Sequence, residues 1–266
     1  TEPTTARWWF SSWSPDETRL ITTQEPYNAM RFVDAATGSF VPTAEPLPSN
    51  CTQPAWSPDG ASIAYVSDSQ WQGTDNRHGD ISILPVTGPD TVGATRLVHR
   101  ATELGAPCDS YPTWTPDSQH LAFANGVNSR SDLANGGRPT ASGGLYTIRP
   151  DGSGVTRLDR AMGGSAQRDS FQPRFSPFHQ GGYFWLSFLS RRDYGNAVAG
   201  TRGTSRQQIW VTAIREDQIG TGVDSSSVGY WLPGQATTSR NISAYWAPRA
   251  CRADGASCSV GSECCG

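Results

Sequence analysis

Lysine is absent from this 266-residue chain, and all 21 of its basic residues are arginine. Charged residues make up 17% of the chain, below the usual quarter, and the formal net charge is -3. Because this charge balance offers no basic field to a polyanion, we expect no nucleic-acid partner. The sequence also lacks any apolar run near the roughly 18 residues of a membrane-spanning helix, so we expect no membrane span.

Motifs of common catalytic sites are missing as well. The histidines at 78, 99, 120 and 179 form no His-Glu-x-x-His pattern. There is no Gly-x-Ser-x-Gly elbow and no Gly-Lys-Ser/Thr phosphate loop. Residues 75–80 and 132–137 resemble calcium loops only loosely, because Asp-x-Asp spacing is missing. We expect no catalytic residues and no cofactor, with calcium kept as an alternative.

Six cysteines indicate an oxidising compartment. They are Cys51, Cys108, Cys251, Cys258, Cys264 and Cys265. An even number, with four in the last sixteen residues, favours disulfides and therefore a secreted or periplasmic protein. A zinc site is the competing interpretation, but Cys-x6-Cys-x5-Cys-Cys lacks the short spacing that lets two thiolates hold one ion. Residue 1 is not Met, so we expect a processed or trimmed chain.

Glycine (28) and proline (19) are abundant, and they occur in the turns of a repeated sequence unit. An aromatic residue followed by a Ser/Thr-Pro-Asp type of turn and an apolar run recurs along the chain. The copies carry Trp13, Trp56, Trp114, Phe175 and, in a shortened fifth copy, Trp246. The intervals of 43, 58, 61 and 71 residues start near the length of a four-stranded propeller blade and grow by insertion.

Each unit predicts two strands joined by a tight turn, then a loop, a third strand and a short fourth strand. In the turn, proline presets φ, the aspartate caps through its side chain, and Gly60 accepts a left-handed conformation. Second strands are expected near 63–66 and 121–124. Third strands are expected at 29–34, 80–85, 144–150 and 208–214, and a fourth strand at 155–158. Copy four departs from the pattern with Phe178 for the aspartate, and copy one has Glu17 for the glycine.

The combination "PAWSPDGASIAYVS" and "LYTIRPDGSGVTRL" resembles the repeats of TolB-type β-propellers, over roughly residues 7–248. The resemblance implies an all-β propeller of four-stranded antiparallel blades, with four full units plus one first strand visible. We assign residues 1–249 to the propeller and 250–266 to a disulfide-rich tail. Three explanations of the blade count stay open. The ring is four-bladed and irregular, or the chain is part of a larger ring in a longer, cut protein, or unrecognised strands complete a fifth blade. We favour the second explanation.

Three long polar insertions, at 68–80, 125–144 and 190–207, should share one face, because antiparallel strands place second-to-third loops together. Long polar loops on a rigid scaffold often carry function, so we predict a ligand-binding face there. Its candidate residues are Trp71, Arg77, His78, Arg130, Asp132, Arg138, Arg191, Arg192, Asp193 and Tyr194. Arginine with aromatic residues suits protein hot spots as well as sugar or carboxylate recognition.

The cysteines at 51 and 108 precede their tryptophans by five and six residues, so both belong at the rim of the long-loop face. A bridge between them and pairing with the tail both stay open. The tail resembles the opening half of a knottin-like framework whose remaining cysteines are missing, and it is too short to hold a core of its own.

These observations predict a secreted or periplasmic, non-enzymatic propeller that serves as a protein-binding or scaffolding module. The resemblance implies protein partners that dock on one face or in the central channel. One alternative is a carbohydrate-binding or polysaccharide-lyase-like propeller, which as a lyase would need a metal or a base at the channel mouth. Another is a processed subunit of a larger extracellular assembly.

Overall fold

The computed structural model of the chain describes residues 8–24, 29–72, 75–127, 144–166, 169–192, 207–236, 241 and 243–247. Its regular structure is sheet, apart from η1 (Ala101–Leu104) and α1 (Asp159–Met162), each four residues long. The strand pairs are antiparallel except for one parallel pair, Gly79 with Cys108, which joins the sheets of the second and third blades. No helix within these ranges has the length and apolar character needed to cross a membrane.

The strands form four blades in chain order. Blade 1 consists of β1 (Trp8–Trp13), β2 (Arg19–Gln24), β3 (Ala29–Asp34) and β4 (Phe40–Val41). Blade 2 consists of β5 (Thr52–Trp56), β6 (Ser62–Gln72), β7 (Asp75–Gly88) and β9 (Arg96–His99), with β8 (Thr91–Val92) paired to the end of β7. Blade 3 consists of β10 (Cys108–Trp114), β11 (Leu121–Gly126), β12 (Gly144–Ile148) and β13 (Thr156–Arg157). Blade 4 consists of β14 (Ser170–Gln180), β15 (Tyr183–Ser190), β16 (Gln208–Arg215) and β17 (Tyr230–Trp231).

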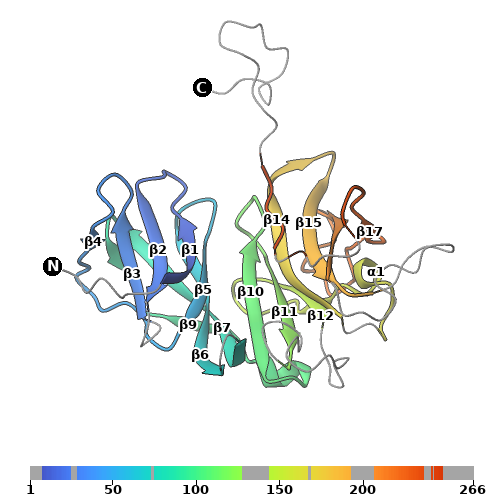
Figure 1. Ribbon diagram of the computed structural model, residues 1–266, viewed down its shortest axis with the longest axis horizontal. Helices are drawn as coiled ribbons and strands as arrows, with labels where there is room; N and C mark the ends of the chain where they lie inside the picture. Colours follow the sequence, from blue (N-terminus) through green and yellow to red (C-terminus); the bar gives the residue numbers. More distant parts are fainter. Residues whose placement is uncertain are drawn as a thin grey trace, which may run out of the picture.

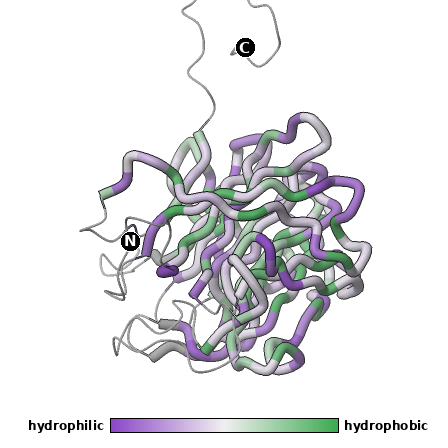
Figure 2. The backbone as a smooth tube through the Cα atoms, turned by 90° about the vertical axis from the view of Figure 1, so that its right-hand side faces the viewer, coloured by the Kyte–Doolittle hydropathy of each residue, from purple (hydrophilic) through white to green (hydrophobic). Residues whose placement is uncertain are grey.

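The core lies between successive blades rather than within one. Three clusters of buried apolar side chains fill the spaces between blades 1 and 2, 2 and 3, and 3 and 4. Figure 1 shows blades 1 and 4 on opposite sides of the molecule, with blades 2 and 3 between them. In Figure 2 the hydrophobic stretches of the backbone run through the interior, and hydrophilic stretches gather at the turns. The prediction of an all-β propeller with four-stranded antiparallel blades is confirmed.

The repeated turn has the same hydrogen bonds in blades 1, 2 and 3. The hydroxyl at its first position donates to the turn aspartate at 2.6 Å in the pairs Ser14–Asp16, Ser57–Asp59 and Thr115–Asp117. Each aspartate also accepts a backbone N–H two residues later. These contacts span six residues or fewer, so the sequence motif alone specifies them. We call the side of the molecule that carries these turns the turn face, and the opposite side the long-loop face.

The turn requires a left-handed residue directly after its aspartate. Gly60 fills that position in blade 2 with φ 77°, whereas Glu17 fills it in blade 1 with φ 58°. A side chain with a Cβ is disfavoured there by roughly 1 kcal/mol. We therefore expect Glu17→Gly to raise the free energy of unfolding by about 0.5 to 1 kcal/mol in urea titrations. The matched change Thr18→Gly, one residue later, should lower it, and a Glu17→Gly protein no more stable than the parent would contradict the prediction.

The innermost strands of the blades meet at the propeller axis. β1, β5, β10 and β14 contact one another in that order. Three of them bulge at a residue just before a proline, where Gln53, Tyr111 and Gln172 have φ between 52° and 54°. Such bulges redirect side chains, here toward the axis. An axial cavity of only about 20 Å³ remains, lined by Phe10, Ser11, Gln53, Pro54, Tyr111, Pro112 and Arg174. That volume suits a single water molecule.

The shortened fifth copy of the repeat occupies the place of a next inner strand. Trp114 donates its indole N–H to the carbonyl of Ala55, which precedes the aromatic residue of blade 2, at 2.9 Å. Trp246 makes the equivalent bond at 3.0 Å to the carbonyl of Arg174, which precedes the aromatic residue of blade 4. The segment 243–247 therefore contacts blade 4 as the first strand of a following blade would.

The insertion at 68–80 is not the loop that its polar sequence suggests. β6 continues to Gln72 and β7 begins at Asp75, so the insertion extends the hairpin of blade 2. Backbone pairs such as Gln70 with His78 hold the extension together. The buried side chain of Asn76 accepts a hydrogen bond from Ser69 at 3.1 Å. Backbone pairing and this internal polar contact replace the apolar alternation on which strand recognition depends.

Candidate functional site

A hollow of about 790 Å³ opens on the turn face. It extends from the first turns of blades 1 and 2 to Pro177, near the end of β14 in blade 4. We call it the turn-face groove; it is lined by Trp13, Ser14, Pro15, Glu17, Ala35, Trp56, Ser57, Pro58 and Pro177. Two indoles and three proline rings give it rigid apolar walls, which lose little conformational entropy when a ligand binds.

The two tryptophans of the groove are held differently. Trp56 stacks on Phe32 with ring centroids 5.5 Å apart, and its indole N–H donates to the carbonyl of Gly60 at 3.1 Å. Trp13 is 57% exposed, whereas its equivalents Trp114 and Phe175 are 6% and 7% exposed. The first blade has no described blade before it to cover the indole. One wall of the groove is therefore fixed, and the other is an accessible aromatic side chain.

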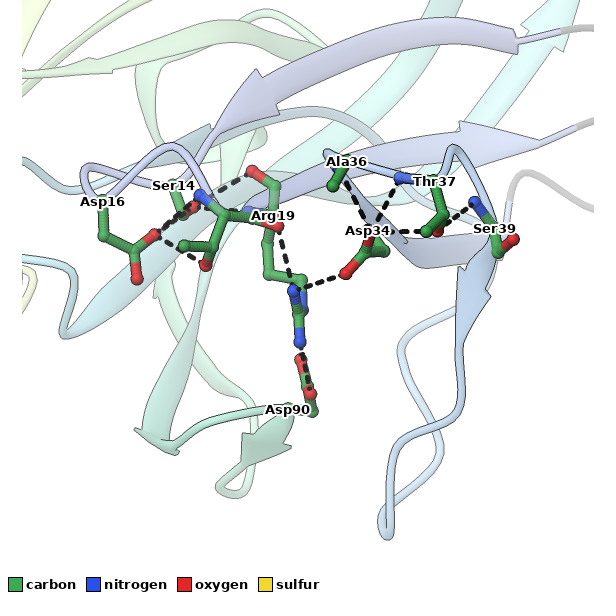
Figure 3. A network of polar contacts seen from close by, with 9 residues as sticks. Ser14, Asp16, Arg19, Asp34, Ala36, Thr37, Ser39 and Asp90 are labelled. Atoms are coloured by element: carbon green, nitrogen blue, oxygen red, sulfur yellow. Dashed lines mark hydrogen bonds and ion pairs between the residues drawn. The ribbon is translucent and has the colours of Figure 1, made fainter.

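A second hollow, of about 480 Å³, lies beside the groove and shares Ser14, Pro15 and Trp56 with it. We call it the interblade pocket because the β7–β8 turn of blade 2 closes it against blade 1. Arg19 crosses this boundary (Figure 3). Its guanidinium donates to both carboxylate oxygens of Asp90, at 2.7 and 2.9 Å, and to Asp34 at 3.1 Å. A bidentate pair across 71 residues of sequence fixes the hairpin of blade 2 on blade 1.

The two hollows together are acidic. Asp16, Glu17, Asp59 and Asp90 line them, and Arg19 is the one basic residue among the linings. Hydrogen bonds from the Ser14 hydroxyl and from Thr18 lower the pKa of Asp16. The Arg19 guanidinium likewise lowers the pKa of Asp90 and has its own pKa raised in return. Asp16 and Asp90 therefore stay ionised below neutral pH, and the site keeps a negative potential.

The residues predicted for the long-loop face are only partly described. Trp71, Arg77 and His78 lie on the extended hairpin of blade 2, where Arg77 is exposed and His78 is half-buried. The ring of His78 contacts Asp68, 3.2 Å from its carbonyl and 3.4 Å from its carboxylate. The remaining residues of the insertions, Arg130, Asp132, Arg138, Asp193 and Tyr194, lie outside the described residues. A binding face made of these loops stays a prediction.

Arg191 and Arg192 follow the end of β15, and both are buried rather than exposed on a loop. Arg192 lies over the ring of Trp210, with 3.7 Å between the guanidinium carbon and the ring centroid. It also donates to the carbonyl of Gly229 at 3.0 Å, and burial lowers its pKa to about 10. Arg191 lies over Phe171 at 5.5 Å. These contacts give the two arginines a packing role in blade 4.

A buried polar cluster joins blades 2 and 3 near the long-loop face. The His99 Nδ1 atom is 2.6 Å from a carboxylate oxygen of Asp109, and Asn125 donates to the other oxygen at 2.8 Å. Burial raises the pKa of Asp109 to about 6, against the lowering effect of its bonds to His99 and Asn125. No spacing motif reveals this cluster, because its members come from three different strands and meet only after the blades pack.

The two described cysteines each have separate partners. The Cys51 thiol donates to the carbonyl of Pro48 at 3.3 Å, and the Cys108 thiol to the carbonyl of Asn76 at 3.4 Å. Burial raises the pKa of Cys51 to about 12, which makes its thiol unreactive. Disulfide pairing stays a prediction, and the tail cysteines lie outside the described residues.

Sequence reasoning missed the turn-face site because its motif also has a structural explanation. Trp56 and Asp59 belong to the repeat and were interpreted as turn residues, which they are. A signal that could have found the site is the asymmetry of copy one, which has Glu17 in place of glycine. The β7–β8 turn at Gly88–Asp90 was not predicted either, although Gly-Pro-Asp is a turn signal.

Comparisons with known proteins bear on the fold. No protein-family model matches the chain, and no curated protein does. A TolB structure from Agrobacterium tumefaciens is similar to it, with a TM-score of 0.51, 21% identity, and coverage of 88% of this chain and 64% of that one. TolB from Acinetobacter baumannii has a TM-score of 0.49, 16% identity, and coverage of 83% and 43%. An oligogalacturonate lyase in complex with manganese has a TM-score of 0.49, 11% identity, and coverage of 86% and 55%.

The likeness to the Agrobacterium tumefaciens structure establishes a TolB-like propeller fold and nothing finer. The chain spans 64% and 43% of the length of the two TolB chains. Structural similarity at such low sequence identity does not carry a function with it, because one fold supports many activities.

Proposed function

We propose that this chain is a secreted or periplasmic, non-catalytic protein-binding module that presents its turn face to a partner. The observation that carries the proposal is the exposed Trp13 beside a hollow of about 790 Å³ with rigid walls. Tryptophan is enriched among the residues that dominate protein interfaces, and an accessible one beside a concave apolar surface favours binding. The even number of cysteines supports the compartment.

The groove suits an extended peptide segment better than a small substrate. It is open along the turn face, and its walls come from turns of blades 1 and 2 and from Pro177 of β14 rather than from an enclosing pocket. Aromatic side chains line the grooves in which several domains bind extended peptides. The axial cavity, by contrast, is too small for such a ligand.

The long-loop face is the second candidate, favoured by the exposed side chain of Arg77 on the extended hairpin. A displayed library of random peptides, selected on the whole chain, separates the two faces. We expect enriched peptides to bind the parent protein and to lose about tenfold in affinity to Trp13→Ala, a typical loss at an interface hot spot. Arg77→Ala should leave their affinity unchanged.

Peptides that bind Trp13→Ala normally and Arg77→Ala poorly would place the partner on the long-loop face. A selection that enriches no peptide would count against a protein-binding function. Thermal unfolding of both variants confirms that each is folded, and we expect both to unfold at the parent temperature because both side chains are exposed.

A further inference from the structure

We propose that the turn-face groove and the interblade pocket receive an arginine or lysine side chain of an extended partner segment, held between the indoles and the acidic rim. This inference rests on the proposed protein-binding function and adds the chemistry of the partner. It depends on three observations: the aromatic walls, the uncompensated carboxylates, and the lack of a cation on either indole.

The aromatic walls can accept a cation that the chain does not supply. Among the described residues, guanidinium groups lie over Phe40, Phe171, Trp210 and Tyr245. None lies over Trp13 or Trp56. Tryptophan is the best aromatic partner for a cation, because the negative face of its ring attracts positive charge. The two strongest candidate rings of the turn face are therefore open to a cation from outside.

The carboxylates at the rim are held in place and lack a cation. Asp16 and Asp59 use one carboxylate oxygen, Oδ1, for the bonds that shape their turns. Their Oδ2 atoms make no hydrogen bond with the described residues. Arg19 forms its ion pairs with Asp90 and Asp34 and makes none with Asp16 or Asp59 among the described residues. Glu17 forms no ion pair within the described part of the chain and adds a further negative charge.

The negative charge of the rim also disfavours two other kinds of ligand. An acidic polysaccharide would be repelled by a rim with four carboxylates and one guanidinium. A neutral sugar could stack on Trp13 and donate hydroxyl hydrogen bonds to the carboxylates, but it carries no positive charge to pair with them. A cation benefits from both the rings and the rim, and the chain has no lysine of its own.

The test uses two fluorescein-labelled peptides of sequence Gly-Ala-Pro-Xaa-Pro-Ala-Gly, with Xaa either arginine or its uncharged isostere citrulline. Fluorescence anisotropy titrations on the whole chain should give about five- to tenfold tighter binding of the arginine peptide. About 0.5 M NaCl should reduce that preference, because salt screens exposed charges. Trp13→Ala should weaken the arginine peptide about tenfold, and Glu17→Gln should reduce its preference over citrulline.

The matched control is Glu103→Gln, which removes an exposed carboxylate remote from the groove and should change neither peptide. Equal binding of the two peptides, binding that Trp13→Ala leaves intact, or no binding at about 1 mM peptide would overturn the inference. So would tighter binding of a neutral oligosaccharide such as maltoheptaose. Self-association of the parent chain that Trp13→Ala abolishes would make the occupant a second copy and would overturn it as well.

Failure here is distinguishable from failure of the proposed function. If neutral peptides from the library bind the parent chain and lose affinity to Trp13→Ala, the turn face binds proteins and only the cationic chemistry is wrong. If neither the library nor the arginine peptide depends on Trp13, both proposals fail.

Discussion

Replacing Trp114 by alanine should lower the free energy of unfolding by about 3 to 5 kcal/mol, the usual cost of truncating a buried tryptophan. Trp114 is 6% exposed, packs in the cluster between blades 2 and 3, and donates to the carbonyl of Ala55. The substitution leaves a cavity and a carbonyl without its partner. Urea titration monitored by circular dichroism measures the change.

Trp13→Ala is the matched control, since Trp13 holds the same position in the repeat but is 57% exposed. Its truncation should change the free energy of unfolding by no more than about 0.5 kcal/mol. The contrast separates two environments of one motif position. The indole of Trp114 is buried between two blades, and the indole of Trp13 is exposed. Equal losses in both variants would refute an accessible Trp13 and weaken the binding proposal with it.

Asp109→Ala should lower the free energy of unfolding by about 3 kcal/mol, because it leaves buried polar groups without their acceptor. The carboxylate is fully buried and accepts contacts from His99 and Asn125 at 2.6 and 2.8 Å. Asp151→Ala offers a comparison, since Asp151 caps an exposed turn through Ser153. Its loss should lower the free energy of unfolding by clearly less than the loss of Asp109, because its turn is exposed to solvent.

The same carboxyl makes stability depend on pH. The pKa of Asp109 is raised to about 6 from the ordinary 3.8, so the folded chain retains a proton that the unfolded chain releases. Its contribution to stability is therefore fully present below pH 4 and is lost as pH rises through about 6. The Asp109→Asn variant has no titratable group at this position. Between pH 4 and pH 7, the free energy of unfolding of the parent should fall relative to that of Asp109→Asn. A difference between the two proteins that is constant with pH contradicts the raised pKa of Asp109.

The sequence predicted the blades well because their signals are local. A hydroxyl, a proline and an aspartate within three residues complete the turn through bonds such as Ser57 to Asp59, and no distant residue is needed. The third strands at 29–34 and 208–214 agree with β3 and β16 for the same reason: each has its apolar run between clear turns. The hairpin extension at 68–80 was missed because its polar residues are ordered by backbone pairing, which leaves no apolar pattern.

By itself, the sequence determined the fold class, the order of the main strands and the position of the repeated turn in blades 1, 2 and 3, since these depend on contacts within a few residues. The tertiary structure alone decided which copy of the repeated aromatic is buried and which is exposed. Trp114 and Trp13 follow the same pattern of residues, but only Trp114 lies against a preceding blade. The acidic hollows and the His99–Asp109 contact have the same origin, because they form between blades whose residues are brought together only by packing.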